Sequence, residues 1–156
     1  MDFAEKKEDD AAAAILSEKY KGFQYFSDVF FPMPEKESIA GASPDFLIDG
    51  KIVGDIKIPY TTRKYIDFIQ HLYSPEKLKA YAKGYYYQLQ MQMICTNTNA
   101  AMIVVFNPKF IGTENEEIAM RSLMIPKDTE VVEEILKAIA DAETRLQLLK
   151  SAIGLR

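Results

Sequence analysis

Two charged residues lie inside an apolar, strand-like stretch of this sequence, and they constrain the fold more than any other feature. Asp55 and Lys57 interrupt the segment GKIVGDIKIPY, which runs over residues 50–60. Side chains two positions apart on a strand point to the same face of a sheet. Charged groups are rarely placed in a sheet without a partner or a chemical task. This strand therefore carries either a structural ion pair or part of a functional site.

A second carboxylate, Asp45, stands ten residues before Asp55 and directly follows Pro44. Between the two carboxylates lies Asp49-Gly50, which is typical of a tight turn and predicts an antiparallel hairpin. A carboxylate, a hairpin-length gap and a carboxylate-x-lysine triplet are together typical of a magnesium-dependent nuclease centre. This is the functional hypothesis that the rest of the chain can support or weaken.

The chemistry of phosphodiester hydrolysis explains why these residue types would be needed. The reaction requires a hard cation, an activated water and stabilisation of developing negative charge. Magnesium binds oxygen and usually takes one or two carboxylates. Asp45, Asp55 and the backbone carbonyl of Ile56 could supply three oxygens, and Lys57 would orient the attacking water or stabilise negative charge. Glu8, on a predicted upstream helix, would add an oxygen directly or through a water.

The turn between the carboxylates sets a condition on this hypothesis. A two-residue turn at Asp49-Gly50 would place Asp45 opposite Gly54, and Asp55 would then point to the other face of the sheet. A shared metal site therefore requires a turn with an odd number of residues. The simplest is a three-residue loop over 48–50 with its glycine in the left-handed region, and a bulge at Gly54 is the alternative.

Length and composition limit the classes of protein to which this chain can belong. The 156 residues favour a single domain over 1–156. No apolar run approaches the roughly 20 residues that span a bilayer, and we expect neither a secretory leader nor a membrane partner. The single cysteine, Cys95, excludes an internal disulfide and suits a reducing cytoplasm. A net charge of −4 is the main bulk observation against nucleic-acid binding, although a carboxylate site filled by cations would itself be acidic.

Hydrophobic periodicity and turn residues predict an α-β-β-β-α-β-β-α order, which gives an α/β fold with a small mixed sheet flanked by helices. In the first helix the apolar stripe is predicted to contain Ala4, Ala11, Ala12, Ile15 and Leu16, with Glu8 on the same stripe. Ser74 and either Asp128 or Thr129 are predicted helix caps. Helices are expected over residues 4–20, within 60–75, starting at 75, over 82–95, and from 129 to about 154. Strands are expected over residues 23–31, 44–59 (two strands), 100–108 and 117–126.

Four segments, in this order and spacing, resemble the lambda-type phage exonucleases, also called YqaJ-like viral recombinases, within the PD-(D/E)xK nuclease superfamily. They are SPDFL (43–47), GDIKIPYTTRKY (54–65), YYYQLQMQM (85–93) and AAMIVVFNPKF (100–110). The resemblance implies a restriction-endonuclease-like core. It also implies exonuclease activity that depends on Mg²⁺, with Mn²⁺ as a substitute, and that resects double-stranded DNA from a 5′ end.

The resemblance assigns roles to individual positions. Asp45 and Asp55 match the metal ligands, Ile56 the residue that lends its carbonyl, and Lys57 the catalytic lysine. Gln88 matches the helix residue that reaches into the active site.

Three further positions are assigned in the same way. Glu8 matches the upstream acidic residue of the family. Ser43 matches a hydroxyl near the phosphate of the DNA end, and Arg63 matches a basic residue that contacts the DNA backbone. Gln92 lies on the same helix face as Gln88 but receives no role.

The chain also departs from the family pattern. Asp55 replaces the commoner glutamate. The chain begins almost at the Glu8 helix, whereas family members carry an upstream segment that helps to hold the 5′-phosphorylated end. We therefore expect weak end preference and reduced processivity. The resemblance further implies a homo-oligomer, a trimer in the family, a phage single-strand annealing protein as partner, and a phage or prophage gene acting in the bacterial cytoplasm.

Two alternatives remain beside an exonuclease. One is an endonuclease or another DNA-processing nuclease of the superfamily. The other is a non-catalytic DNA-binding or interaction module that keeps the fold. The joint presence of Asp45, Asp55, Lys57 and Gln88 argues against the second alternative, because a decayed enzyme has no reason to keep the four together.

Overall fold

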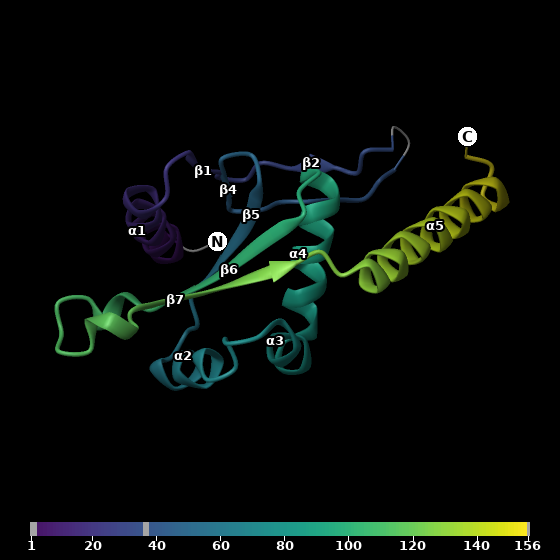
Figure 1. Ribbon diagram of the computed structural model, residues 1–156. Helices are drawn as coiled ribbons and strands as arrows, with labels where there is room; N and C mark the ends of the chain where they lie inside the picture. The colour runs from purple at the N-terminus through teal and green to yellow at the C-terminus, as the bar shows by residue number, and fades with distance from the viewer. Residues whose placement is uncertain (1–2, 36–37, 156) are drawn as a thin grey trace.

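A mixed β-sheet forms the centre of the structure, and helices cover both of its faces (Figure 1). This computed structural model describes residues 3–35 and 38–155. The strands are β1 (Phe23–Tyr25), β2 (Phe31–Pro32), β3 (Gly41–Ala42), β4 (Phe46–Ile48), β5 (Ile52–Lys57), β6 (Ala100–Phe106) and β7 (Met120–Pro126). The α-helices are α1 (Phe3–Lys19), α2 (Thr62–Ile69), α3 (Pro75–Tyr81), α4 (Lys83–Thr96) and α5 (Thr129–Ala152), with short 3-10 turns at Pro108–Phe110 and Glu116–Ile118.

The main sheet has five strands in the order β1-β4-β5-β6-β7. Strands β5 and β6 are parallel, and the other neighbours are antiparallel. The three helices α2, α3 and α4 form the crossover between the parallel pair, as a parallel connection requires. The α/β class with a small mixed sheet, predicted from the sequence, is therefore confirmed.

Each face of the sheet has its own apolar core. On one face α2, α3 and α4 pack against the middle strands, and on the other face α1 packs alone. Side chains alternate along β5 between these cores, which explains why almost the whole strand is buried. The first core includes Val53, Tyr65, Leu78, Leu89, Met93 and Ile103, and the second includes Ala12, Leu16, Phe46, Ile56, Val104 and Phe106.

The predicted helix starts are confirmed. The Ser74 hydroxyl accepts a hydrogen bond from the Lys77 backbone N–H at 3.2 Å, and the Asp128 carboxylate accepts one from Val131 N–H at 3.2 Å. Asp128 also accepts from Lys79 and Tyr86, both at 3.0 Å. The cap of α5 is therefore tied to the helices that cover the sheet.

The hairpin between β4 and β5 meets the odd-number condition, but one residue later than expected. Ile48 pairs with Ile52, so the loop is Asp49–Lys51 and not 48–50. Gly50 has φ 66° and is left-handed, as predicted, and Asp49 also has a positive φ of 51°. The prediction missed this shift because Asp, like Asn, tolerates the left-handed region better than most non-glycine residues.

Two other expectations are wrong in detail. The single strand predicted over 23–31 is two short strands, because the chain bends at Asp28, which has φ 59°. In α1 the buried residues are Ala12, Ala13 and Leu16, whereas Ala11 and Ile15 are exposed. The packed stripe is thus rotated by about one residue from the predicted one.

Helix α5 leaves the body of the protein and projects outward with the C-terminus (Figure 1). Only Val131 of this helix is buried. None of the helices in the described parts of the chain is long and apolar enough to cross a lipid bilayer.

Candidate active site

Asp55 is the centre of a buried polar cluster at the end of β5. Its side chain lies on the face covered by α4, and the residue is only 3% exposed. Oδ1 accepts a hydrogen bond from Gln92 Nε2 at 2.8 Å and a longer one from Gln88 Nε2 at 3.5 Å. Oδ2 forms an ion pair with Lys57 Nζ. A buried carboxylate is therefore held by two amides and one ammonium group.

Lys57 is fixed from three sides. Besides its ion pair with Asp55, its ammonium group donates to Gln88 Oε1 at 3.2 Å. The ammonium also lies 4.4 Å from the centre of the Tyr85 ring, which is within the range of a cation–π contact. These contacts hold a long, flexible side chain in one orientation beside the carboxylate.

Asp45 directly precedes β4 and approaches the same end of β5. Its Oδ2 accepts a hydrogen bond from the Ile56 backbone N–H at 2.6 Å. Burial and the negative charge of Asp55 raise the pKa of Asp45 from its ordinary 3.8 to about 7, against the opposing influence of Ile56 N–H and Lys57. Two carboxylates thus share a poorly solvated site, which is an arrangement that a cation would stabilise.

The two carboxylates approach each other at the end of the β4–β5 hairpin. Leu47 pairs with Val53, and both side chains contribute to the core beneath α4. Asp55 lies two residues after Val53 and shares that face. Asp45 precedes β4, and its backbone N–H donates to the Gly54 carbonyl at 2.9 Å, so its place beside Asp55 is given by its contact with Ile56 N–H and not by strand pairing. The odd-numbered turn that the nuclease hypothesis required is present.

The donor set fits a hydrated magnesium ion. The N–H and C=O of one strand residue point to the same edge, so the Ile56 carbonyl faces the Asp45 side together with its N–H. Gln92 Oε1 is buried and has no hydrogen-bond partner among the described residues, and a metal-bound water would supply one. In the described part of the chain no three carboxylate, imidazole or thiol groups form a ready metal site. An ion here would complete its shell with water and substrate oxygens, as magnesium usually does.

The upstream helix brings a second acidic residue near Asp45. The negative charge of Asp9 is among the causes that raise the pKa of Asp45. Asp9 lies three and four residues before the buried Ala12 and Ala13, and so shares their helix face. The role of Glu8 as a direct or water-mediated metal ligand stays a prediction, and Asp9 is an acidic neighbour of Asp45 that the sequence analysis did not consider.

The two residues assigned to DNA contacts lie at the surface. Ser43 is exposed just before β4, and Arg63 is exposed in the first turn of α2. Neither belongs to the buried cluster, and their roles stay predictions.

Gln92 is the second residue that sequence reasoning missed. It is completely buried and makes the shorter of the two amide contacts to Asp55. The spacing of four residues from Gln88 could have revealed it, because residues four apart lie on one side of a helix. Gln90, between them, points elsewhere: its amide donates to Pro126 O at 3.0 Å and accepts from Asp128 N–H at 2.9 Å.

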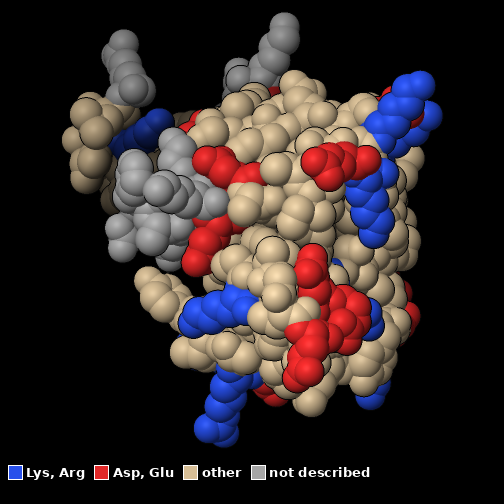
Figure 2. All heavy atoms as spheres, turned by 90° about the vertical axis from the view of Figure 1, so that its left-hand side faces the viewer, with Lys and Arg blue, Asp and Glu red and all other residues tan. Residues whose placement is uncertain are grey.

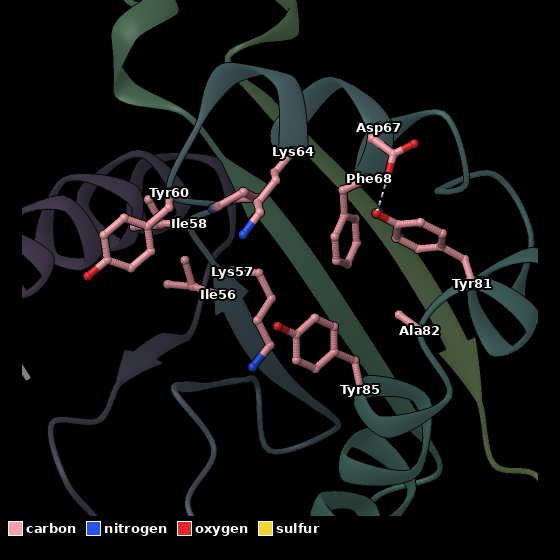
Figure 3. Close-up of a pocket in the computed structure, with 11 residues that line it drawn as sticks. Ile56, Lys57, Ile58, Tyr60, Lys64, Asp67, Phe68, Tyr81, Ala82 and Tyr85 are labelled. Carbon is pink, nitrogen blue, oxygen red and sulfur yellow. Dashed lines mark hydrogen bonds between the residues drawn. The ribbon is translucent and has the colours of Figure 1, made fainter.

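A cavity of about 620 Å³ opens beside Lys57 (Figure 3). Ile56 and Lys57, which contact Asp45 and Asp55, form one part of its wall, so the cavity lies next to the carboxylate cluster although neither of these two carboxylates lines it. The remaining wall contains several aromatic side chains and Lys64. The site thus combines a buried acidic centre with an accessible space large enough for a small ligand.

Comparison with known proteins gives matches in structure but not in sequence. No protein-family model matches the chain, and no curated protein sequence matches it significantly. A crystal structure of LHK-Exo in complex with dAMP superposes with a TM-score of 0.69 at 21% identity, over 95% of this chain and 71% of the other. The alkaline exonuclease LHK-Exo from Laribacter hongkongensis gives 0.68 at 21% identity, over 95% and 72%.

A phage-related exonuclease from Haemophilus somnus is also similar, with a TM-score of 0.59 at 16% identity, over 94% of this chain and 71% of the other. The likeness extends over nearly the whole of this chain, so it concerns the entire fold and not one motif. It agrees with the resemblance seen in the four sequence segments. The chain therefore has the fold of the alkaline and phage-related exonucleases.

Proposed function

We propose that this protein is a metal-dependent deoxyribonuclease, and specifically an exonuclease that resects duplex DNA from the 5′ end. The observation that carries the proposal is the meeting of Asp45, Asp55 and Lys57 at the end of β5, with Gln88 bridging the lysine and the Asp55 carboxylate. The exonuclease fold supports it, as does the mononucleotide bound by the similar protein LHK-Exo.

The chemistry follows from the positions of these groups. Magnesium bound by Asp45, Asp55 and the Ile56 carbonyl would polarise the scissile phosphate and lower the pKa of a bound water. Lys57 lies against Asp55 and can donate to the attacking water or to the negative charge that develops on phosphate oxygen. Gln88 holds the Lys57 ammonium, and Gln92 holds the carboxylate of Asp55. The helix α4 thus positions both reactive groups of β5.

The biological setting belongs to the same proposal. It includes double-stranded DNA as substrate, a phage single-strand annealing protein as partner, a homotrimer, and activity in the cytoplasm of a bacterial host. These expectations rest on the resemblance of the four sequence segments.

Digestion of labelled DNA tests the proposed activity. The purified protein is incubated with Mg²⁺ and three duplex substrates: linear DNA labelled at the 5′ end, linear DNA labelled at the 3′ end, and covalently closed circular DNA. We expect release of 5′-terminal nucleotides first, survival of the circle, and complete loss of hydrolysis in EDTA. Cutting of the circle would instead favour the endonuclease alternative.

Substitution of Lys57 tests its proposed role in catalysis. Lys57→Ala should abolish hydrolysis while metal and DNA binding persist, because Lys57 acts chiefly in the transition state. Lys51→Ala is a matched control, since Lys51 is an exposed lysine in the turn before the same strand. Near-normal turnover by Lys57→Ala would remove this residue from the mechanism.

A further inference from the structure

The cavity beside Lys57 has two aromatic walls. Tyr60 stands on one side, and Phe68, Tyr81 and Tyr85 stand on the other, with the side chains of Lys57 and Lys64 between them in Figure 3. The three aromatic residues of the second wall come from α2, α3 and α4, so helices that follow β5 build the wall next to the acidic cluster.

The aromatic residues of the second wall pack against one another. The Phe68 and Tyr85 rings are stacked with centroids 5.8 Å apart and planes at 29°. Tyr81 meets Phe68 edge-on at 5.4 Å. Phe68 is buried, and it therefore anchors two tyrosines that stay partly open to solvent.

Tyr60 offers the open ring faces of the cavity, because it is 80% exposed. The Tyr85 ring is stacked on Phe68 and lies against the Lys57 ammonium. The Tyr81 ring is stacked on His71 at 4.2 Å, so these two tyrosine rings shape the wall opposite Tyr60. Exposed aromatic faces beside a reactive centre suit stacking with nucleobases, which is worth roughly 1–3 kcal/mol per base and tolerates any sequence.

The charged residues that line the cavity are unevenly distributed. Lys57 and Lys64 are cationic, and Lys57 is also the residue nearest the carboxylate cluster. Asp67 lines the cavity as well and accepts a hydrogen bond from the Tyr81 hydroxyl at 2.7 Å. A phosphate is attracted to the lysine end, whereas a carboxylate beside the aromatic wall repels phosphate and can accept from an exocyclic amino group of a base.

We propose that this aromatic cavity is a subsite for the base of the nucleotide next to the scissile phosphate, with the phosphate held at the Lys57 end. The inference rests on the proposed nuclease function and extends it. The volume of the cavity, about 620 Å³, lies within the range of pockets that enclose small ligands. Stacking would hold the nucleotide in register with Asp45 and Asp55 without selecting a base sequence.

The test measures binding of a mononucleotide, independently of hydrolysis. The affinities of dAMP and of deoxyribose 5-phosphate, which lacks the base, are compared by isothermal titration calorimetry in Mg²⁺. We expect dAMP to bind about tenfold more tightly. Tyr60→Ala should reduce dAMP affinity to that of deoxyribose 5-phosphate, and Tyr60→Phe should keep it. Tyr60 is highly exposed, so neither variant endangers the fold.

Tyr73→Ala is the matched control. Tyr73 is another exposed tyrosine, at 67%, but it does not line the cavity, and its loss should leave dAMP binding unchanged. Equal affinity of the wild type for the two ligands, absence of binding by either, or unchanged dAMP binding by Tyr60→Ala would each overturn the subsite.

A parallel digestion of linear duplex with the same preparations separates the two claims. If base-dependent binding requires Tyr60 but no DNA is hydrolysed, the subsite stands and the nuclease proposal fails. If DNA is hydrolysed but the base adds no affinity, the nuclease proposal stands and the subsite fails.

Discussion

At the scale of single residues, the three glutamines of α4 have different tasks, and only Gln90 and Gln92 are fully buried. Gln88 contacts Lys57 and Asp55, and Gln92 contacts Asp55 from a fully buried position. Gln90 is equally buried but ties α4 to the end of β7 and to the start of α5. Gln90 and Gln92 therefore form a matched pair for separating support of the site from support of the fold.

The first prediction uses this pair. Gln92→Met should lower Mg²⁺ affinity by about 10–100-fold, which is the usual cost of losing a group that orients a metal ligand. Methionine has a similar volume but cannot donate to Asp55 Oδ1. Titration of Mg²⁺ by calorimetry measures the change.

Gln90→Met is the control for this prediction. It should lower the unfolding temperature, because it leaves the Asp128 N–H and the Pro126 carbonyl without partners, but it should not change Mg²⁺ affinity. Equal Mg²⁺ affinity of Gln92→Met and wild type would show that Gln92 only fills space.

A second residue-scale prediction concerns Asp45 in metal-free protein. Its pKa is raised from 3.8 to about 7, so between these values the folded state holds a proton that the unfolded state has lost. Stability therefore falls as pH rises through this window, and the penalty is complete above pH 7. Asp45→Asn has no such penalty and can still accept from Ile56 N–H. In EDTA the variant should be more thermostable than wild type at pH 8, by a few degrees, and the gap should shrink at pH 5.

The control for this comparison is Asp141→Asn, an exposed acid on α5. Its unfolding temperature should differ from that of wild type equally at both pH values. Saturating Mg²⁺ should raise the unfolding temperature of wild type at pH 8 but not that of Asp45→Asn. A constant gap between Asp45→Asn and wild type at both pH values would contradict the electrostatic account.

At the scale of elements, the hairpin was the most predictable part of the site and α1 the least. The hairpin was predictable because the proposed chemistry required the two carboxylates to meet, which needs an odd-numbered turn or a bulge. The exact loop was missed because Asp49 accepts a left-handed conformation. In α1 the stripe was misplaced because alanines occupy four consecutive positions, 11–14, and carry little information about which side is buried.

The register of this hairpin depends on a close contact between Phe46 and Gly54. The two residues pair across β4 and β5, and the Phe46 ring covers Gly54 so tightly that a Cβ there would overlap the ring. Since Asp55 is the next residue, a shift of β5 at Gly54 would move the carboxylate away from its amide partners.

The third prediction follows from this contact. Gly54→Ala should destabilise the protein by roughly 1–3 kcal/mol, as overpacking of a core usually does. It should also weaken Mg²⁺ binding, because β5 must shift to accommodate the methyl group. The loss of stability should be smaller in a Phe46→Leu background, which removes the overlapping ring, and chemical denaturation of the four proteins in this cycle measures the coupling.

Gly84→Ala is the control for Gly54→Ala. A Cβ at Gly84 meets no neighbouring atom, and alanine is the better helix former, so this variant should be as stable as wild type or more stable. If both glycine variants were equally stable, close packing at Gly54 would not set the register.

At the scale of the whole molecule, the sheet and its helices followed from local patterns, whereas the cavity did not. The buried strand 100–106 and the capped helices were visible as apolar runs and cap residues. The aromatic wall brings together residues of α2, α3 and α4 that have no shared sequence pattern. Its existence depends on how three helices pack, which periodicity does not encode.

The net charge of the protein affects how it could bind DNA. A protein with a net charge of −4 should repel DNA, and acidic side chains gather in several places on the face shown in Figure 2. The proposed binding of DNA would therefore depend on the local field at the site. In the proposed mechanism the two carboxylates lie where the phosphate would bind, so without metal we expect their charge to be the main obstacle.

The last prediction follows from this field. At pH 8, in EDTA and at low salt, Asp45→Asn should bind a short duplex at least about threefold more tightly than wild type, although it cannot hydrolyse DNA. Asp141→Asn changes the net charge equally, from −4 to −3, but on the projecting helix α5. It should bind DNA as wild type does, because charges beyond the screening length have little influence. Fluorescence anisotropy measures the three affinities. If both variants gained equally, DNA binding would depend on total charge, and the acidic pair would not lie at the phosphate position.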